Sequence, residues 1–295
     1  MIKKIRYILE ASLLYLLMSI SKLLPVNWAS GFGGWVGRLV GPRLAASRKA
    51  TTNIKESFPH KSDIEHNEIL SGMWDNLGRV MMEYPHLKHI SRDRTEIINA
   101  DILKKYKDKP AIVIAAHQGN WEICPPAMFL QHQIVSTPIY RAPNNALTDK
   151  MLLKARSLNG KIKAIPKSKT GTRKIVQNLQ DGKFLGVLID QKYNEGVPAD
   201  FFGRPAMTSP IFVQLAEKFK CPIIPLRLER LNGASFRITV FEPLDTSNKT
   251  TDDVIKMSHN LLEEWITKKP EQWLWLHRRW DSKYLKQNTG KNSND

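Results

Sequence analysis

Short apolar runs alternate with longer amphipathic stretches from Pro110 onward, and this alternation restricts the possible folds more than any other feature of the sequence. Apolar runs bounded by turn residues are typical of buried strands, and the stretches between them are long enough for helices. We expect strands at 111–116, 134–140, 184–190, 222–229 and 236–241, with helices at 147–158, 172–179, 210–219 and 252–267. This order predicts an α/β fold with a mostly parallel central sheet flanked by helices.

The first hundred residues are expected to be helical, and they open with the most apolar segment of the chain. Glu10 and Lys22 leave only eleven uncharged positions between them, which is short for a membrane-spanning helix. The residues that follow, from Pro25 to Trp28, do not form the small-residue site at which a signal peptide is cleaved. We therefore expect residues 1–30 to be an uncleaved membrane anchor, either a marginal single span or a helix lying in the interface. A buried helix of a soluble domain is the alternative.

Charge indicates an anionic partner. The 295 residues carry 45 Lys and Arg against 28 Asp and Glu, a net charge of +17. Eleven of the cations lie between Arg141 and Lys183, where only Asp149 and Asp181 oppose them. An anionic lipid surface or an acidic protein explains this balance, and nucleic acid is the runner-up because no aromatic-rich single-strand platform and no RNP motif accompanies the charge.

The stretch AIVIAAHQGNWE carries the clearest chemical signal. His117 follows a buried strand, at the end where open α/β sheets place their ligands. Glu122 lies just beyond the next turn, so its carboxylate is expected to hydrogen-bond one imidazole nitrogen and leave the other free to take a proton. His117 is thus a candidate general base oriented by Glu122, with a purely structural histidine as the alternative. The stretch lacks the paired histidines of HExxH, so no metal is expected.

The chain resembles the lipid A biosynthesis acyltransferases of Gram-negative bacteria, a lauroyl/myristoyl transferase family within the wider glycerophospholipid acyltransferase group. The group's signature is a histidine, four residues and an acid, which His117 and Glu122 supply in its glutamate form. Five further blocks carry the likeness over nearly the whole chain: MWDNLGRVMMEYPHL (73–87), IYRAPNNALTD (139–149), LIDQK (188–192), FFGRPAMTSPIFVQLAEKF (201–219) and PEQWLWLHRRW (270–280).

The resemblance implies transfer of a fatty acyl chain from acyl carrier protein to a hydroxyl of a lipid A precursor. It assigns the general base to His117 and the orienting acid to Glu122, and it implies no cofactor. Arg156 lies where the family has an arginine tied to activity, for an anionic head group or the thioester oxyanion. Asp190 matches a functional acid of the family and is, like Arg141, a candidate for substrate binding.

Residues 31–286 are accordingly expected to form the acyltransferase domain, with a polar tail at 287–295. Because the carrier protein is cytosolic, the domain is expected on the cytoplasmic face of the bacterial inner membrane, where anionic lipids are a further partner. Nucleic acid is not expected as a partner. Acyl-CoA as donor, or another glycolipid or aminolipid as acceptor, remain alternatives to the substrates that the family implies.

Overall fold

A computed structural model of the chain describes residues 2–280, and the predicted polar tail at 287–295 lies outside them. The helices are α1 (Ile2–Leu23), α2 (Val26–Val40), α3 (Ser47–Ser57), α4 (Asp63–Glu83), α5 (Leu87–Asp93), α6 (Ala100–Lys105), α7 (Cys124–His132), α8 (Ala146–Arg156), α9 (Lys169–Gln180), α10 (Ile211–Phe219) and α11 (Thr251–Lys268). Short 3-10 turns include η3 (Trp121–Ile123) and η4 (Pro270–Gln272). The strands are β1 (Thr95–Ile98), β2 (Ala111–Ala115), β3 (Ser136–Tyr140), β4 (Ile165–Pro166), β5 (Phe184–Leu188), β6 (Val197–Phe201), β7 (Arg204–Thr208), β8 (Ile223–Asn232) and β9 (Ser235–Val240).

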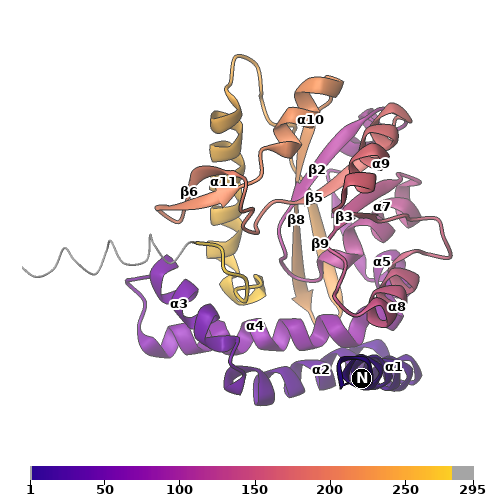
Figure 1. The fold of residues 1–295 in the computed structure, drawn as a ribbon, viewed down its shortest axis with the longest axis vertical. Coiled ribbons are helices and arrows are strands. Elements are labelled where there is room, and N and C mark those ends of the chain that lie inside the picture. The colour runs from indigo at the N-terminus through magenta and orange to yellow at the C-terminus, as the bar shows by residue number, and fades with distance from the viewer. Residues whose placement is uncertain (1, 281–295) are drawn as a thin grey trace, which may run out of the picture.

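Seven strands form the central sheet in the order β1-β9-β8-β2-β5-β3-β4 (Figure 1). Every neighbouring pair is parallel except β8 and β9, which form an antiparallel hairpin pair. The five expected strands and four expected helices are all present within a few residues of their predicted bounds. The prediction of a mostly parallel sheet flanked by helices is thus confirmed. The short strands β1 and β4 and the separate hairpin β6–β7 were not expected.

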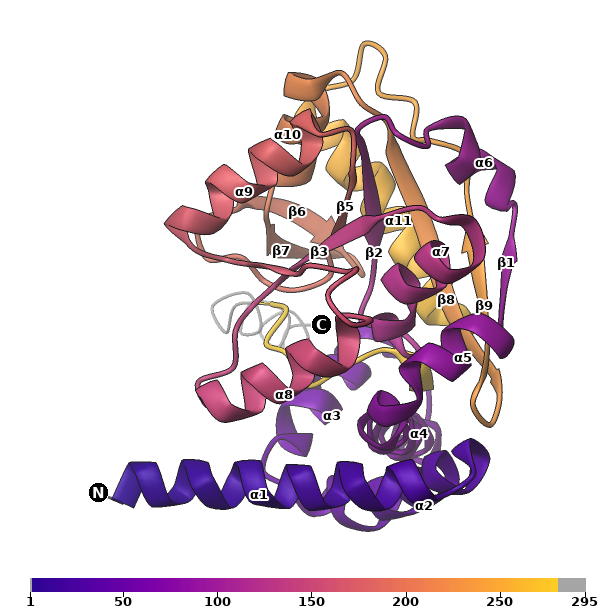
Figure 2. The ribbon, with the colours of Figure 1, turned by 90° about the vertical axis from the view of Figure 1, so that its right-hand side faces the viewer.

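Helices cover both faces of the sheet, which is why β2 is buried along its whole length (Figures 1 and 2). Ile112 and Ile114 pack into the cluster that includes α10 and α11. The residues between them in sequence face the other way, so Ala111 and Val113 pack with α5 and α7. The cavity described below lies on the face of α7.

Helices α1 and α2 lie at one end of the molecule, beneath α4 (Figures 1 and 2). Glycines let α2 and α4 approach closely, since a Cβ built on Gly33 would lie 2.3 Å from the carbonyl oxygen of Gly78. Both helices leave many large apolar side chains exposed: Ile5, Ile8, Leu9, Leu13, Tyr15, Leu16, Leu17, Ile20 and Leu23 on α1, and Trp28, Phe32, Trp35, Leu39 and Val40 on α2. Within residues 2–280, no helix combines the length and apolar character needed to cross a membrane.

Candidate active site

Three of the five candidate residues come directly after neighbouring parallel strands. His117 follows β2, Asp190 follows β5 and Arg141 follows β3, and β5 lies between β2 and β3 in the sheet. The carboxyl ends of parallel strands meet at one edge, so residues far apart in sequence are brought together there. Sequence separates His117 from Asp190 by 73 positions, yet their side chains are in contact.

Asp190, and not Glu122, is the hydrogen-bond partner of the His117 ring. Nδ1 of His117 lies 2.8 Å from Oδ1 of Asp190, and the backbone N–H of His117 donates to Oδ2 of the same carboxylate at 2.9 Å. This corrects the sequence-based expectation that Glu122 hydrogen-bonds the imidazole. The reason is topological, because the pairing of β2 with β5 places Asp190 beside the ring.

Asp190 is fixed and ionised. Its side chain is only 2% exposed, and Trp273 Nε1–H donates to Oδ2 at 2.7 Å. Burial alone would raise the pKa of this carboxyl, but the electrostatic interaction with His117 and the hydrogen bonds from His117 and Trp273 outweigh burial and hold the pKa well below its usual range. Because an ionised carboxylate only accepts, the neutral imidazole must carry its proton on Nδ1. Nε2 is then left as the acceptor.

Glu122 bonds Arg156 instead of His117. Its Oε1 accepts from Arg156 Nη2 at 2.6 Å and from the hydroxyl of Tyr84 at 2.9 Å. Burial lowers the pKa of the Arg156 guanidinium, but Glu122 and Tyr84 outweigh burial and raise that pKa above its ordinary value. Since His117 already has Asp190, the partly buried guanidinium is the group that needs the second carboxylate. The two acids of the site therefore bind two different basic side chains, His117 and Arg156.

Both pairs meet at a cavity of about 420 Å³. His117, Glu122, Arg156 and Arg141 all line this cavity, with Arg141 exposed at its rim. Its other lining is largely apolar and comes from the strands and α7, including Val113, Ala115, Met128, Pro138, Ile139, Val187, Leu188 and Leu226. A volume of this size with a mainly apolar lining and a few polar groups is typical of a small-molecule or lipid-chain site.

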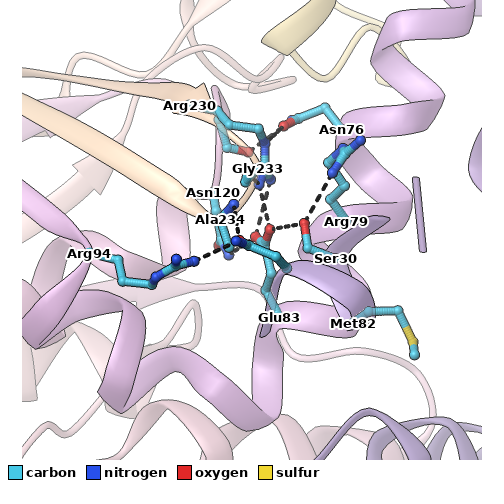
Figure 3. Close-up of polar contacts among 12 residues, drawn as sticks. Ser30, Asn76, Arg79, Met82, Glu83, Arg94, Asn120, Arg230, Gly233 and Ala234 are labelled. Carbon is cyan, nitrogen blue, oxygen red and sulfur yellow. Dashed lines mark hydrogen bonds and ion pairs between the residues drawn. The ribbon is translucent and has the colours of Figure 1, made fainter. Parts of the chain in front are cut away.

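A buried polar network fixes the turn that follows His117 (Figure 3). The fully buried carboxylate of Glu83, on α4, accepts from Asn120 Nδ2 at 2.8 Å, from Ser30 Oγ at 2.7 Å and from both terminal nitrogens of Arg230. Asn120 in turn accepts the backbone N–H of Glu122 at 3.3 Å. A buried carboxylate with four donors is well satisfied, so the turn between the two candidate catalytic side chains is held rigidly.

Sequence analysis missed Tyr84, Trp273 and Gln191 at this site. Tyr84 lies in the block 73–87, and Trp273 in the block 270–280, so the blocks that carry the family likeness marked their neighbourhoods without indicating a role. Gln191 directly follows Asp190 and places its amide nitrogen 3.1 Å from His117 Nε2. It also lies in a block that carries the family likeness, LIDQK (188–192), and it follows a strand, so two signals marked its position.

Comparison with known proteins identifies the family of the chain. Residues 2–282 match the family of bacterial lipid A biosynthesis acyltransferases. The chain belongs to this family. Among curated relatives, a lipid A biosynthesis acyltransferase of Haemophilus influenzae is 23% identical over 82% of this chain and 78% of its own length. Lipid A biosynthesis acyltransferase 2 of Shigella flexneri is 26% identical, over 83% and 79%.

The names of the curated relatives specify different acyl groups. A lipid A biosynthesis myristoyltransferase of Escherichia coli K12 is 24% identical over 82% of this chain and 77% of its own length. A palmitoleoyltransferase of the same strain is 21% identical, over 85% and 84%. Similarity at this level supports an acyltransferase of lipid A biosynthesis and does not select one acyl chain.

Proposed function

We propose that this protein transfers a fatty acyl chain from acyl carrier protein to a hydroxyl group of a lipid A precursor, with His117 as general base. The observation that carries the proposal is the His117–Asp190 pair beside the cavity, because it fixes the imidazole tautomer in which Nε2 can accept a proton. Acyl-CoA as donor and other glycolipid or aminolipid acceptors are the alternatives. The different-class alternative, a nucleic-acid-binding protein, leaves this pair and the apolar cavity unused.

The substrate hydroxyl supplies the nucleophile. Nε2 of His117 takes its proton as the oxygen attacks the thioester carbonyl, and Asp190 stabilises the imidazolium that forms. When the tetrahedral intermediate collapses, the sulfur leaves and receives the proton from Nε2. An acyl chain that lies along the apolar lining can place its carbonyl beside His117, which lines the same cavity.

Arg156 is proposed to stabilise the oxygen of that intermediate. Its Nη2 is committed to Glu122 and Tyr84, whereas its Nε is buried and makes no hydrogen bond within the described residues. A buried N–H without a partner costs free energy unless a ligand uses it. Glu122 thereby becomes a positioning residue that holds Arg156, and Arg141 at the rim remains a candidate contact for an anionic group of the substrate.

Mass spectrometry of a lipid A precursor incubated with the full-length protein and a donor tests the function. We expect the precursor to gain the mass of one acyl group with acyl carrier protein thioester as donor. Parallel reactions use acyl-CoA, and a glycolipid without free hydroxyacyl chains serves as the control acceptor. A gain of mass with acyl-CoA alone would overturn the proposal that acyl carrier protein is the donor. If the folded protein gives no gain of mass with any donor, the proposed function is wrong.

We also propose that α1 and α2 bind the cytoplasmic face of the inner membrane by lying in the interface. Their exposed apolar side chains gather at one end of the molecule, as Figures 1 and 2 show for the helices themselves. Lys22 and Arg43 add positive charge at this end, which suits an anionic lipid surface. The acceptor of the proposed reaction is a membrane lipid, so this placement would bring it to the cavity.

Replacement of Leu9 and Leu13 by aspartate is expected to weaken binding to vesicles that contain anionic lipid by about tenfold or more per substitution. Both side chains are more than half exposed on α1, so the folded protein should tolerate the change. Co-sedimentation with vesicles measures the partition coefficient. The matched control is Ile211→Asp, on the exposed start of α10 at the opposite end of the molecule. Equal binding by all variants would contradict the proposed surface.

A further inference from the structure

Lys167 lies beside Arg141 at the carboxyl edge of the sheet, and sequence analysis did not single it out. β3 and β4 are neighbouring parallel strands, and Tyr140 lies opposite Pro166 in their register. Arg141 and Lys167 directly follow these two residues, and the backbone N–H of Lys167 donates to the carbonyl oxygen of Tyr140 at 2.9 Å. Both basic residues are exposed and line the cavity. The sheet order therefore places two cations next to each other on the edge that carries His117.

Neither of these two cations has a carboxylate of its own. Within residues 2–280, no carboxylate forms an ion pair with the side chain of Arg141 or Lys167. Desolvation and then the charge of Arg141 lower the pKa of the Lys167 ammonium, whereas Asp190 opposes the change. Asp190 is already bonded to His117 and Trp273. Like charges held together in this way are unfavourable unless an anion binds between them.

A phosphate group suits this pair of cations better than a carboxylate does. One guanidinium already satisfies both oxygens of a carboxylate, whereas a phosphate monoester offers three strong acceptor oxygens and more negative charge. The planar fork of Arg141 can bind two phosphate oxygens, and the ammonium of Lys167 adds a compact charge beside it. Arg156 is not available for this purpose, because its Nη2 is committed to Glu122 and Tyr84.

We propose that Arg141 and Lys167 form a binding site for a phosphate group of a substrate, at the rim of the cavity. This inference rests on the proposed acyl transfer. Two substrates of that reaction can supply the phosphate: the acceptor lipid, and the donor through the arm that carries its thioester. β3 and β4 lie two and three strands from β2, so the pair is roughly 10–14 Å from His117. The two cations therefore hold and orient a substrate without touching the reacting atoms.

The double variant Arg141→Gln, Lys167→Gln is expected to raise the KM of one substrate by about 10²-fold, about tenfold for each lost charged contact, with kcat changed little. The matched control is Lys150→Gln, Lys174→Gln, which removes the same charge from exposed positions of segment 141–183 that do not line the cavity. Unchanged KM values in the first variant, an equal rise in the control, or a loss confined to kcat would each overturn the proposal.

The substrate whose KM rises identifies the source of the phosphate. If it is the acceptor, a lipid A precursor treated with a phosphatase should show the same raised KM with the wild type, and the two changes should not add. If it is the donor, the KM of the acyl carrier protein thioester should rise in the double variant, whatever the phosphorylation of the acceptor. An acceptor effect that adds fully to dephosphorylation, with the KM of the donor unchanged, would overturn the site.

A second measurement needs no acyl transfer. In protein whose lysines carry ¹³C-methyl groups, the signal of Lys167 can be assigned by its absence in Lys167→Arg. Titration with inorganic phosphate should shift this signal more than that of Lys150, and Arg141→Gln should reduce the shift. Equal shifts for the two lysines would overturn the site. If the wild type proves inactive in acyl transfer, the proposed function fails by itself, and the spectrum still decides whether the pair binds phosphate.

Discussion

The His117→Ala protein is expected to fold and to lose about 10⁴-fold in kcat, an effect at the upper end of what general base catalysis contributes. His117 is the histidine of the cavity lining whose ring is hydrogen-bonded by Asp190. Loss of the imidazole removes the proton acceptor and leaves substrate binding to the rest of the cavity. KM should therefore change far less than kcat.

A measurement of the free energy of unfolding distinguishes the catalytic role predicted for His117 from a purely structural role. The side chain is 16% exposed and lies at the end of a strand. Asp190 would keep two donors, the backbone N–H of residue 117 and Nε1–H of Trp273, so the free energy of unfolding should fall by only about 1–3 kcal/mol. Unfolding curves recorded beside the kinetics measure both quantities. A protein that no longer folds would make His117 a structural residue.

The alternation of apolar runs and helices was sufficient to predict the sheet, because a strand buried on both faces leaves a continuous apolar run in the sequence. Ala111–Ala115 is the clearest case, since all five residues are buried. The missed strands have no such run. Ile165–Pro166 is only two residues long, and the hairpin 197–208 turns at Phe202 and Gly203, both with positive φ, without the Asn-Gly or Asp-Gly pair that would have indicated the turn.

Three of the five candidate residues, His117, Arg141 and Asp190, stand where the sequence itself places them, after strands. Their hydrogen-bond partners depend on which strands are neighbours in the sheet, and the sequence does not state the strand order. Glu122, five positions from His117, looked like the orienting acid because it is close in sequence, whereas the sheet order brings Asp190 to the ring from 73 positions away. Arg156 is the last residue of α8, and only the folded structure shows that its guanidinium forms a hydrogen-bonded ion pair with Glu122.

Asp190→Asn is expected to lower kcat by about 10³–10⁴-fold, through the tautomer of His117. Oδ2 of Asp190 accepts from two donors, the backbone N–H of His117 and Nε1–H of Trp273, while Oδ1 accepts from Nδ1 alone. The single oxygen of asparagine therefore has its best place at the Oδ2 position. Its NH₂ group then faces Nδ1 and makes that nitrogen an acceptor, so the ring proton moves to Nε2 and the base is blocked.

Glu122→Gln is the matched comparison, because it makes the same carboxylate-to-amide change in the other acid of the cavity. Glu122 contacts Arg156 and Tyr84, so its loss should weaken one charge-assisted hydrogen bond and cost about tenfold in kcat without altering the tautomer. ¹⁵N spectra of labelled histidine distinguish the two tautomers beside the kinetics. A larger loss in Glu122→Gln than in Asp190→Asn would return the orienting role to Glu122, since the geometry predicts the opposite order.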